Sequence, residues 1–282
     1  MDILNALPAD LLTGLAYMGL FAVIFLAAKW LKDLFTPYKL NKELAEHDNF
    51  AISLTMSGYY FAVAMIFAGQ LSGPGVAFRV DFLNVGMYSL LGVLVLNLCR
   101  WINDKFILRT FCNIEKLTQE QDLGVGVIQM AVYAATGFIA SGALNGEGSI
   151  WTFLSFFALG QLCLVLCSVC YNWIAPFDLY EELEQQNLSA AIAFAGTTLA
   201  VGLIVMNSVS GDFVAWQSDL TSFAVSVFIA FICLPLLLWI TDRLIIPGKS
   251  LRREIVEDQN LAAGLLEATI AVSFAMVLVK LI

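Results

Sequence analysis

Apolar residues fall into eight long runs separated by polar connections, and this pattern predicts the fold. A helix of about 20 mostly apolar residues crosses the hydrocarbon core of a bilayer. Long and short connections alternate, so each odd run pairs with the even run that follows. The sequence therefore predicts an all-α membrane protein with eight transmembrane helices. The runs cover approximately residues 11–34, 49–71, 82–103, 123–144, 150–173, 188–210, 220–246 and 261–282.

Polar positions recur along the chain at one fixed spacing. Trp101 and Asp104 return as Trp239 and Asp242, and Asn49 returns as Asn187. We call the interval from Trp101 to Trp239, which all three pairs share, the repeat spacing. A shared period of this length indicates that one ancestral unit was duplicated. We therefore expect two pseudo-equivalent four-helix units, residues 1–144 and 145–282. All helix pairs run in the same direction, so the helix-pair repeats are parallel and predict a pseudo-rotation about the membrane normal.

A short polar residue opens every even helix and is followed by Ala or Gly. Such a side chain accepts hydrogen bonds from the first-turn N–H groups, and small residues let helices approach closely. Alternatively, four inward-facing helix N-termini form a positive vestibule for an anion. Both interpretations stay open at this point. The four residues are Asn49, Asp122, Asn187 and Asn260.

These openings also carry a family resemblance. Residues 187–196 resemble the Asn-x-Ala-Ala-x5-Gly pattern of YjfL-like proteins, the bacterial inner-membrane family catalogued as domain of unknown function 350. Residues 260–264 are similar to its Asn-x-Ala-Ala-Gly element, whereas Asp122 departs from the pattern in having Asp for Asn. The resemblance spans the chain as two tandem copies. It implies no established activity and suggests a role beside envelope-stress components.

The composition is that of a membrane protein, and the negative net charge argues against nucleic-acid binding. Hydrophobic residues make up 60% of the chain, charged residues 13%, and the net charge is −9. Soluble domains are about a quarter charged, and nucleic-acid binding needs a basic surface that this chain lacks. The sequence offers no catalytic motif, cofactor motif or metal-ligand spacing. We therefore expect no enzyme, no cofactor and no metal, and a lipid bilayer as the main partner. The oligomeric state stays open.

The basic residues predict an orientation in the membrane. All but two of the 14 Lys and Arg residues flank the long links, and Arg79 and Lys280 are the exceptions. Among them, Lys29 and Lys32 precede the first long link. The positive-inside rule places the long links in the cytoplasm. We expect a bacterial inner-membrane protein with both termini outside the cytoplasm.

Tryptophans mark the same side of the membrane. One Trp lies at the end of each odd helix, next to the long link, and indole rings prefer the headgroup region. We expect an aromatic belt of interface anchors rather than a binding site. Its members are Trp30, Trp101, Trp173 and Trp239.

Two polar residues lie farther inside their helices than the short polar residues that open the even helices. Glu267 stands seven residues after Asn260, about 10 Å into its helix at 1.5 Å per residue, and Gln129 is its counterpart one repeat spacing earlier. An intramembrane ionisable residue is a functional candidate. The two side chains either line a path for a small solute or ion, or join helices, with Glu267 as a neutral acid. Asn97 is expected to cap or bridge helices.

The third long link has acids and no base. Usually such a run is a solvated face; alternatively it docks a basic cytoplasmic protein. Its acids are Asp178, Glu181, Glu182 and Glu184.

The sequence leaves two hypotheses for the function. The protein is either a non-enzymatic accessory protein of envelope stress that recruits such a basic partner, or a channel or carrier for a small solute or ion that uses Glu267 and Gln129.

Overall fold

The computed structural model describes residues 2–71, 77–108, 112–146, 148–240, 250 and 253–281. Within these ranges eight helices are long and apolar enough to cross a membrane, which confirms the predicted all-α membrane fold. They are α1 (Asp2–Phe35), α3 (Phe50–Leu71), α4 (Phe78–Phe106), α6 (Leu123–Leu144), α7 (Ile150–Ile174), α9 (Leu188–Val209), α10 (Trp216–Ile240) and α11 (Leu261–Leu278).

We keep the words odd and even for the order of the eight membrane-spanning helices along the chain: the odd helices are α1, α4, α7 and α10, and the even helices are α3, α6, α9 and α11. Three of the odd helices begin earlier than the apolar runs indicate. α1 begins at Asp2, α4 at Phe78 and α10 at Trp216, because helical hydrogen bonding continues past the apolar stretch. Acidic residues in the first turns of α4 and α10, Asp81 and Asp219, suit the positive end of a helix. Residues 72–76 and 147, which belong to two of the short connections, lie outside the described residues, as do the end of the seventh run, Asp242 and several basic residues of the fourth link.

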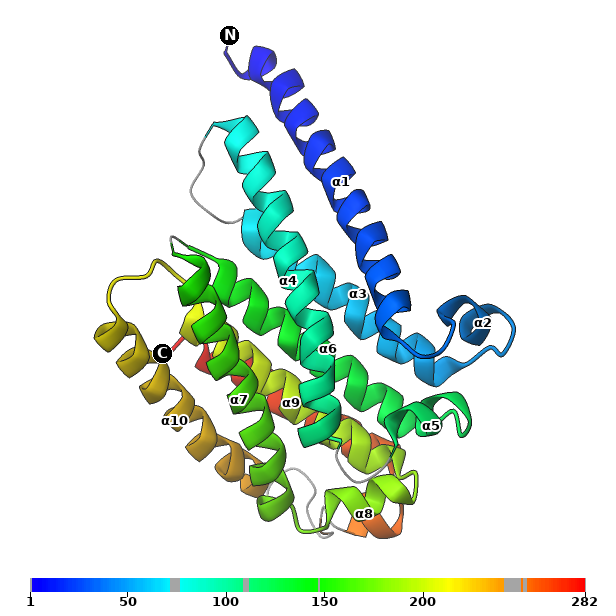
Figure 1. Cartoon of the computed structure of the whole chain (residues 1–282). Coiled ribbons are helices and arrows are strands. Elements are labelled where there is room, and N and C mark those ends of the chain that lie inside the picture. Colours follow the sequence, from blue (N-terminus) through cyan, green and yellow to red (C-terminus); the bar gives the residue numbers. More distant parts are fainter. Residues whose placement is uncertain are drawn as a thin grey trace.

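Each long link is built around a short helix. These are α2 (Leu40–Ala45), α5 (Asn113–Thr118), α8 (Leu179–Glu184) and the π-helical turn η2 (Arg253–Glu257). α2, α5 and α8 gather at one end of the bundle (Figure 1), which we call the link end. The opposite end, which carries the short connections, we call the loop end. There Gly146 and Gly211 adopt φ values of 97° and 114°, which side chains with a Cβ rarely tolerate.

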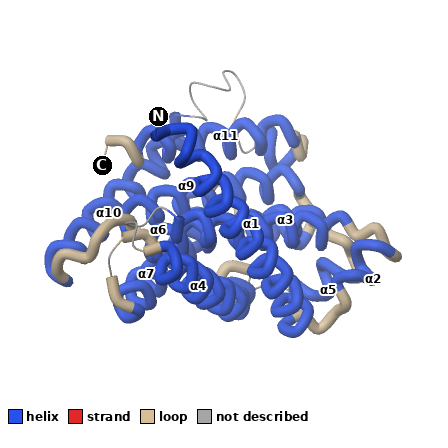
Figure 2. Tube along the Cα trace, turned by 90° about the horizontal axis from the view of Figure 1, so that it is seen from above, coloured by secondary structure: helices blue, strands red, loops and turns tan. Residues whose placement is uncertain are grey.

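The even helices of the membrane-spanning set, α3, α6, α9 and α11, form a continuous row. α3 packs on α6, α6 on α9, and α9 on α11, while the odd helices pack against the outside of this row (Figures 1 and 2). The middle helices are the most enclosed: 78% of the membrane window of both α6 and α9 is buried, against 11% for α1. The core of the protein is therefore the row α3–α6–α9–α11.

Glycines allow the even helices to touch backbone to backbone. A Cβ on Gly58 would overlap the backbone of Met130 on α6, and a Cβ on Gly196 would overlap the backbone of Ala268 on α11. The second pair lies one repeat spacing after the first. Close approach through small residues is the usual way in which helices associate without a hydrophobic driving force. The repeat thus preserves a contact as well as a sequence.

The two predicted units share this row. The boundary predicted between residues 144 and 145 falls directly after α6, yet α6 packs closely on α9 of the second unit. A Cβ on Gly202 of α9 would lie 2.6 Å from the Cβ of Ala135 on α6. The units are therefore related by the repeat but are not packed as separate bodies.

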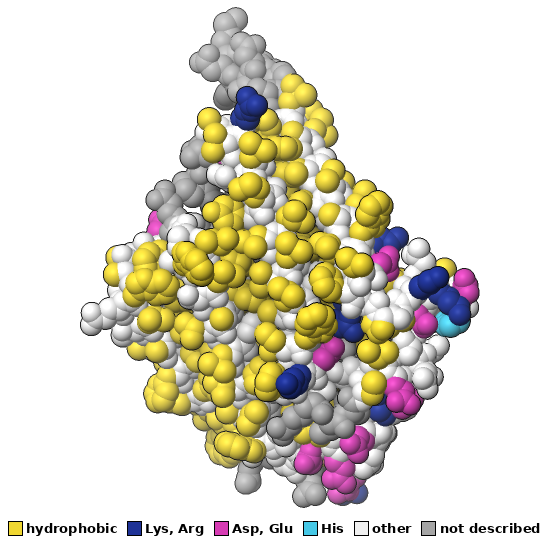
Figure 3. All heavy atoms as spheres, viewed as in Figure 1, with side chains coloured by type: hydrophobic (Ala, Val, Ile, Leu, Met, Phe, Trp, Pro, Cys, Tyr) yellow, Lys and Arg dark blue, Asp and Glu magenta, His cyan; other side chains and the backbone are white. Residues whose placement is uncertain are grey.

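The surface separates apolar from charged side chains. Hydrophobic side chains cover most of the face in Figure 3, and charged groups gather near the link end. Trp30, Trp101, Trp173 and Trp239 are all exposed and lie near the link ends of their helices. An apolar belt with charges at one end is what a bilayer requires of a surface.

Candidate functional site

The four junctions between a link and an even helix share one geometry. A residue with positive φ precedes each cap, at Asp48 (46°), Gln121 (51°), Gln186 (59°) and Gln259 (44°). The cap then turns its Oδ1 toward the first turn: that of Asn187, for example, accepts from the N–H groups of Ser189 and Ala190 at 3.0 and 3.2 Å. Asn49, Asp122 and Asn260 accept equivalent bonds.

The Asn caps also use their amide groups. The Nδ2 of Asn187 donates to the carboxylate of Glu182 at 2.7 Å and to the carbonyl of Ile255 at 2.8 Å, which ties the third link to the fourth. Asn49 is bound in the same way by Glu43 and Leu117. Carboxylates thus stand beside the helix openings, and the caps occupy N–H groups of the first turn. This geometry favours capping and leaves little to attract an anion.

Asp122 is the one cap of the four that is not Asn, and its neighbouring side chain also differs from those at the other caps. Where the other links place Glu beside an Asn cap, this link places Lys116, whose Nζ lies 3.9 Å from Oδ2 of Asp122. Burial raises the pKa of Asp122 above its ordinary value, and bonds from Val125 and Gly124 and the charge of Lys116 act against this. The departure from the family pattern is therefore a matched exchange of Asn with Glu for Asp with Lys.

Glu267 is buried on α11, with 1% of its surface exposed. The hydroxyl of Tyr171 on α7 donates to its Oε1 at 3.0 Å. Its Oε2 has no hydrogen-bond partner among the described residues. Glu267 is thus held by an odd helix of the same unit.

Gln129 has a different partner. Its Nε2 donates to Oδ1 of Asp104 on α4 at 3.3 Å, and Asp104 is paired with Arg100 at the same distance. The sequence places Gln129 and Glu267 at one depth, but their partners lie on different odd helices, α4 and α7. The structure does not bring the two candidate residues together.

The sequence missed the most buried basic residue of the described chain, Lys32. We counted it among the basic residues that flank the first long link and not as a candidate site residue, yet only 1% of its surface is exposed. Its Nζ donates to the hydroxyl of Tyr133 on α6. It lies 4.3 Å from the ring centre of Tyr133 and 5.0 Å from that of Tyr59 on α3. No carboxylate of the described residues lies within 4 Å of it.

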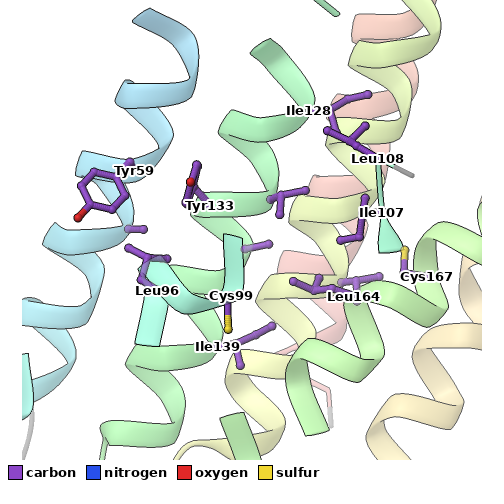
Figure 4. Close-up of a cluster of buried hydrophobic side chains, with 14 of the residues drawn as sticks. Tyr59, Leu96, Cys99, Ile107, Leu108, Ile128, Tyr133, Ile139, Leu164 and Cys167 are labelled. Carbon is purple, nitrogen blue, oxygen red and sulfur yellow. The ribbon is translucent and has the colours of Figure 1, made fainter. Parts of the chain in front are cut away.

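Tyr59 is fixed in turn by two neighbours. Its hydroxyl donates to the carbonyl of Ala28 on α1 at 2.8 Å and accepts from Nδ2 of Asn97 on α4 at 2.9 Å. The rings of Tyr59 and Tyr133 meet edge to face, with centres 5.6 Å apart (Figure 4). Asn97 bridges helices, as the sequence suggested. We call Lys32, Tyr59, Asn97 and Tyr133 the lysine cluster.

A small cavity adjoins the lysine cluster on its link side. Its volume is about 10 Å³, and its lining includes Arg100, Asp104, Gln129 and Tyr133. A void of this size holds one water when it is polar. Asp104 also accepts from the amide of Asn113 on α5 at 3.1 Å. Polar groups therefore continue from Lys32 to the first residue of a link helix.

The two buried hydrogen bonds occupy related helices. Lys32 and Tyr133 join α1 to α6, and Tyr171 and Glu267 join α7 to α11. The repeat relates α1 to α7 and α6 to α11, since these helices are offset by about one repeat spacing in the sequence. Each unit thus joins the same two helices through a tyrosine hydroxyl. The first unit adds a base, and the second adds an acid.

The acids of the third link divide into two pairs. Asp178 caps α8 by accepting from Tyr180 and Glu181 N–H groups, and Glu182 is buried against Asn187. Glu181 and Glu184 are exposed. Two of the four candidate docking residues therefore serve the fold.

Known proteins give a consistent picture. The chain is 23% identical over 263 residues to a UPF0719 transmembrane protein of Aquifex aeolicus (strain VF5), and the match covers 91% of this chain and 95% of that protein. No solved structure matches the chain significantly. The family described as Domain of Unknown Function (DUF350) matches residues 4–144 and again residues 147–282. The chain is therefore a multi-pass membrane protein that belongs to this uncharacterised family and contains two tandem copies of its domain.

Proposed function

We propose that the protein is a non-enzymatic membrane protein that conducts protons across the membrane, and that these protons pass between water at the link end and the buried amine of Lys32. The observation that carries this proposal is the burial of Lys32 in a membrane-spanning helix with no carboxylate of the described residues within 4 Å. Burying an amine without a close carboxylate costs free energy, because the charged form loses its hydration. Such a cost is expected to persist only where the residue has a use.

The second unit has no amine at the equivalent position. The position one repeat spacing after Lys32 is Cys170, on the equivalent helix of the second unit. That unit builds the same helix arrangement without a lysine there. The natural replacement of lysine by cysteine supports a functional role for Lys32 in the first unit.

The adjoining cavity is small, which favours a proton over a larger solute. A void of about 10 Å³ has room for about one water molecule. Tyr133 lines this cavity and accepts the hydrogen bond of Lys32, so its hydroxyl can pass a proton between the two. A carrier that lines one path with Gln129 and Glu267 has less support, because each has its own separate partner.

Proton movement into liposomes tests this proposal. Purified protein is reconstituted with a trapped pH-sensitive dye, and a potassium diffusion potential drives the flux. We expect flux in the wild type and at least about tenfold slower flux in Lys32→Cys, which copies the second unit. Lys29→Cys, one turn away and half-buried, is the matched control and keeps the wild-type rate. An inactive wild type, or equal rates in wild type and Lys32→Cys, overturns the proposal.

A second candidate function uses the third link. Glu181 and Glu184 are exposed on α8, and the third link contains no Lys or Arg. These charges support docking of a basic cytoplasmic protein during membrane stress. Native-membrane pull-downs with wild type and with Glu181→Gln/Glu184→Gln test this idea. Loss of one basic partner in the double variant supports it, and identical partner sets exclude it.

The orientation follows from the same charges. We propose an inner-membrane location with the link end in the cytoplasm and both termini outside, supported by the gathering of charged residues at the link end. A C-terminal alkaline phosphatase fusion tests this, because the enzyme is active only outside the cytoplasm. An inactive phosphatase with an active cytoplasmic reporter at the same position contradicts it.

A further inference from the structure

We propose that Glu267 is a second proton-exchanging group, an acid in the second unit that complements the base in the first. This extends the proposed function to a second site, but its test below does not depend on proton flux. The inference starts from geometry: Glu267 lies on the helix equivalent to that of Tyr133, and it bonds Tyr171 on the helix equivalent to that of Lys32.

The surroundings of Glu267 do not neutralise an anion. Tyr171 gives one hydrogen bond to Oε1, and Oε2 has no partner among the described residues. Among the residues that the structure describes, no Lys, Arg or His lies within 4 Å of the carboxyl of Glu267. An isolated carboxylate is very costly in an apolar interior, and such groups become neutral instead. The surroundings of Glu267 therefore favour its protonated form.

The number of oxygen atoms favours a proton over a metal ion. The described contacts supply the carboxyl of Glu267 and the hydroxyl of Tyr171. Calcium takes six to eight oxygen ligands, and magnesium takes six in octahedral geometry. Three oxygen atoms from two side chains fall well short of these sets, whereas a proton needs one oxygen.

The first unit has no acid at the equivalent position. Gln129 occupies the equivalent position in the first unit, where an amide serves as the helix-joining group. An amide forms hydrogen bonds as an acid does but does not titrate. The second unit therefore has an exchangeable proton where the first unit has a fixed donor.

Few other titratable groups occupy the neighbouring elements. α9 has none, and the described part of α10 carries Asp219 near the loop end and Cys233. On α7, Cys167 lies one turn before Tyr171. In η2, Glu254 accepts from the amide of Asn260, and Arg253 pairs with Glu257 at the exposed link end. Glu267 and Tyr171 are thus the central pair of the proposed site.

Labelling with a hydrophobic carbodiimide tests the proposal. The reagent adds to a protonated carboxyl within a membrane, and the N-acylurea product is located by mass spectrometry of the whole protein in liposomes. We expect an adduct on Glu267 whose formation slows as pH rises, by up to about tenfold per pH unit once the group ionises. Tyr171→Phe shifts the pH at which labelling slows, because it removes the hydroxyl that contacts the carboxyl.

Two comparisons make the outcome decisive. Glu267→Gln loses the adduct, and Glu267→Asp shows whether a carboxyl at this position labels when the side chain is shortened. The exposed Glu181 serves as a control that reacts with a water-soluble carbodiimide. Absence of an adduct on wild-type Glu267, or a labelling rate that does not change with pH, overturns the proposal. Absence of proton flux with pH-dependent labelling overturns only the proposed function.

Discussion

Asn49 and Asn187, one repeat spacing apart, make the same two hydrogen bonds through Nδ2. Each donates to a glutamate of its own link and to a backbone carbonyl of the next link, that of Leu117 at 2.7 Å and that of Ile255 at 2.8 Å. The two carbonyls are themselves separated by the repeat spacing. The repeated asparagine is therefore a cap that also ties together two consecutive links.

Replacing this asparagine by aspartate should destabilise the protein. Asn187→Asp keeps the cap oxygen but loses both donated bonds and places a carboxylate against Glu182. Each buried partner left unsatisfied costs about 1–3 kcal/mol. We expect a lower thermal midpoint in detergent, with Gln185→Glu, an equal charge change at an exposed neighbour, as the control. An unchanged midpoint for Asn187→Asp contradicts this assignment.

The second junction allows a charge-exchange experiment. Asp122→Asn and Lys116→Glu are each expected to lower stability, because each leaves an unmatched partner. The double variant recreates the Glu and Asn arrangement seen at Glu254 and Asn260. A double-mutant cycle on thermal or denaturant unfolding should show a favourable coupling of about 1 kcal/mol or more. Additive losses would show that the two positions are independent.

Asp122 also predicts a pH dependence. Burial raises its pKa in the folded protein above the ordinary value of 3.8, so the unfolded chain loses this proton first as pH rises. The contribution of Asp122 to the free energy of unfolding is therefore largest below pH 3.8 and decreases as pH rises through the folded-state value. Asp122→Asn removes this dependence. The stability of the wild type relative to the variant should fall across this window, and a rise would contradict the assignment.

The close contact between α9 and α11 can be tested by adding one methyl group at Gly196. Gly196→Ala introduces a Cβ that overlaps the backbone of Ala268, and α9 must move away from α11. Overpacking of this kind costs about 1–3 kcal/mol. Gly19→Ala on α1, where nothing lies within 4 Å, should be neutral or slightly stabilising. Equal thermal midpoints for the two variants would refute the close contact.

Hydropathy predicted the helices because membrane crossing depends on local sequence. A run of about 20 apolar residues is sufficient to span the bilayer core, and the repeat spacing located the four junctions. Helix ends were less predictable: α4 begins at Phe78 because hydrogen bonding continues into polar residues. The partners of Asn187 could not be predicted, since the carbonyl of Ile255 lies 68 residues away.

Lys32 was misplaced for a physical reason. Beside the exposed Trp30 it resembles an ordinary interfacial base, yet the packing of α1 against its neighbours encloses it. One signal was present in the sequence: Ile24, Ala28 and Lys32 are spaced by four and form one buried stripe. Helix periodicity assigns these positions to a single face. The tyrosines that surround the amine come from α3 and α6, which only the tertiary structure reveals.

The central claim is that the amine of Lys32 exchanges protons with water at the link end. It is tested most directly by ¹⁵N NMR of protein with labelled lysine side chains in lipid nanodiscs, where the signal missing from Lys32→Cys identifies the amine. We predict that this signal titrates reversibly while the protein stays folded, and that Tyr133→Phe slows its exchange. A Lys32 signal that does not respond to pH anywhere in the folded range would contradict the account.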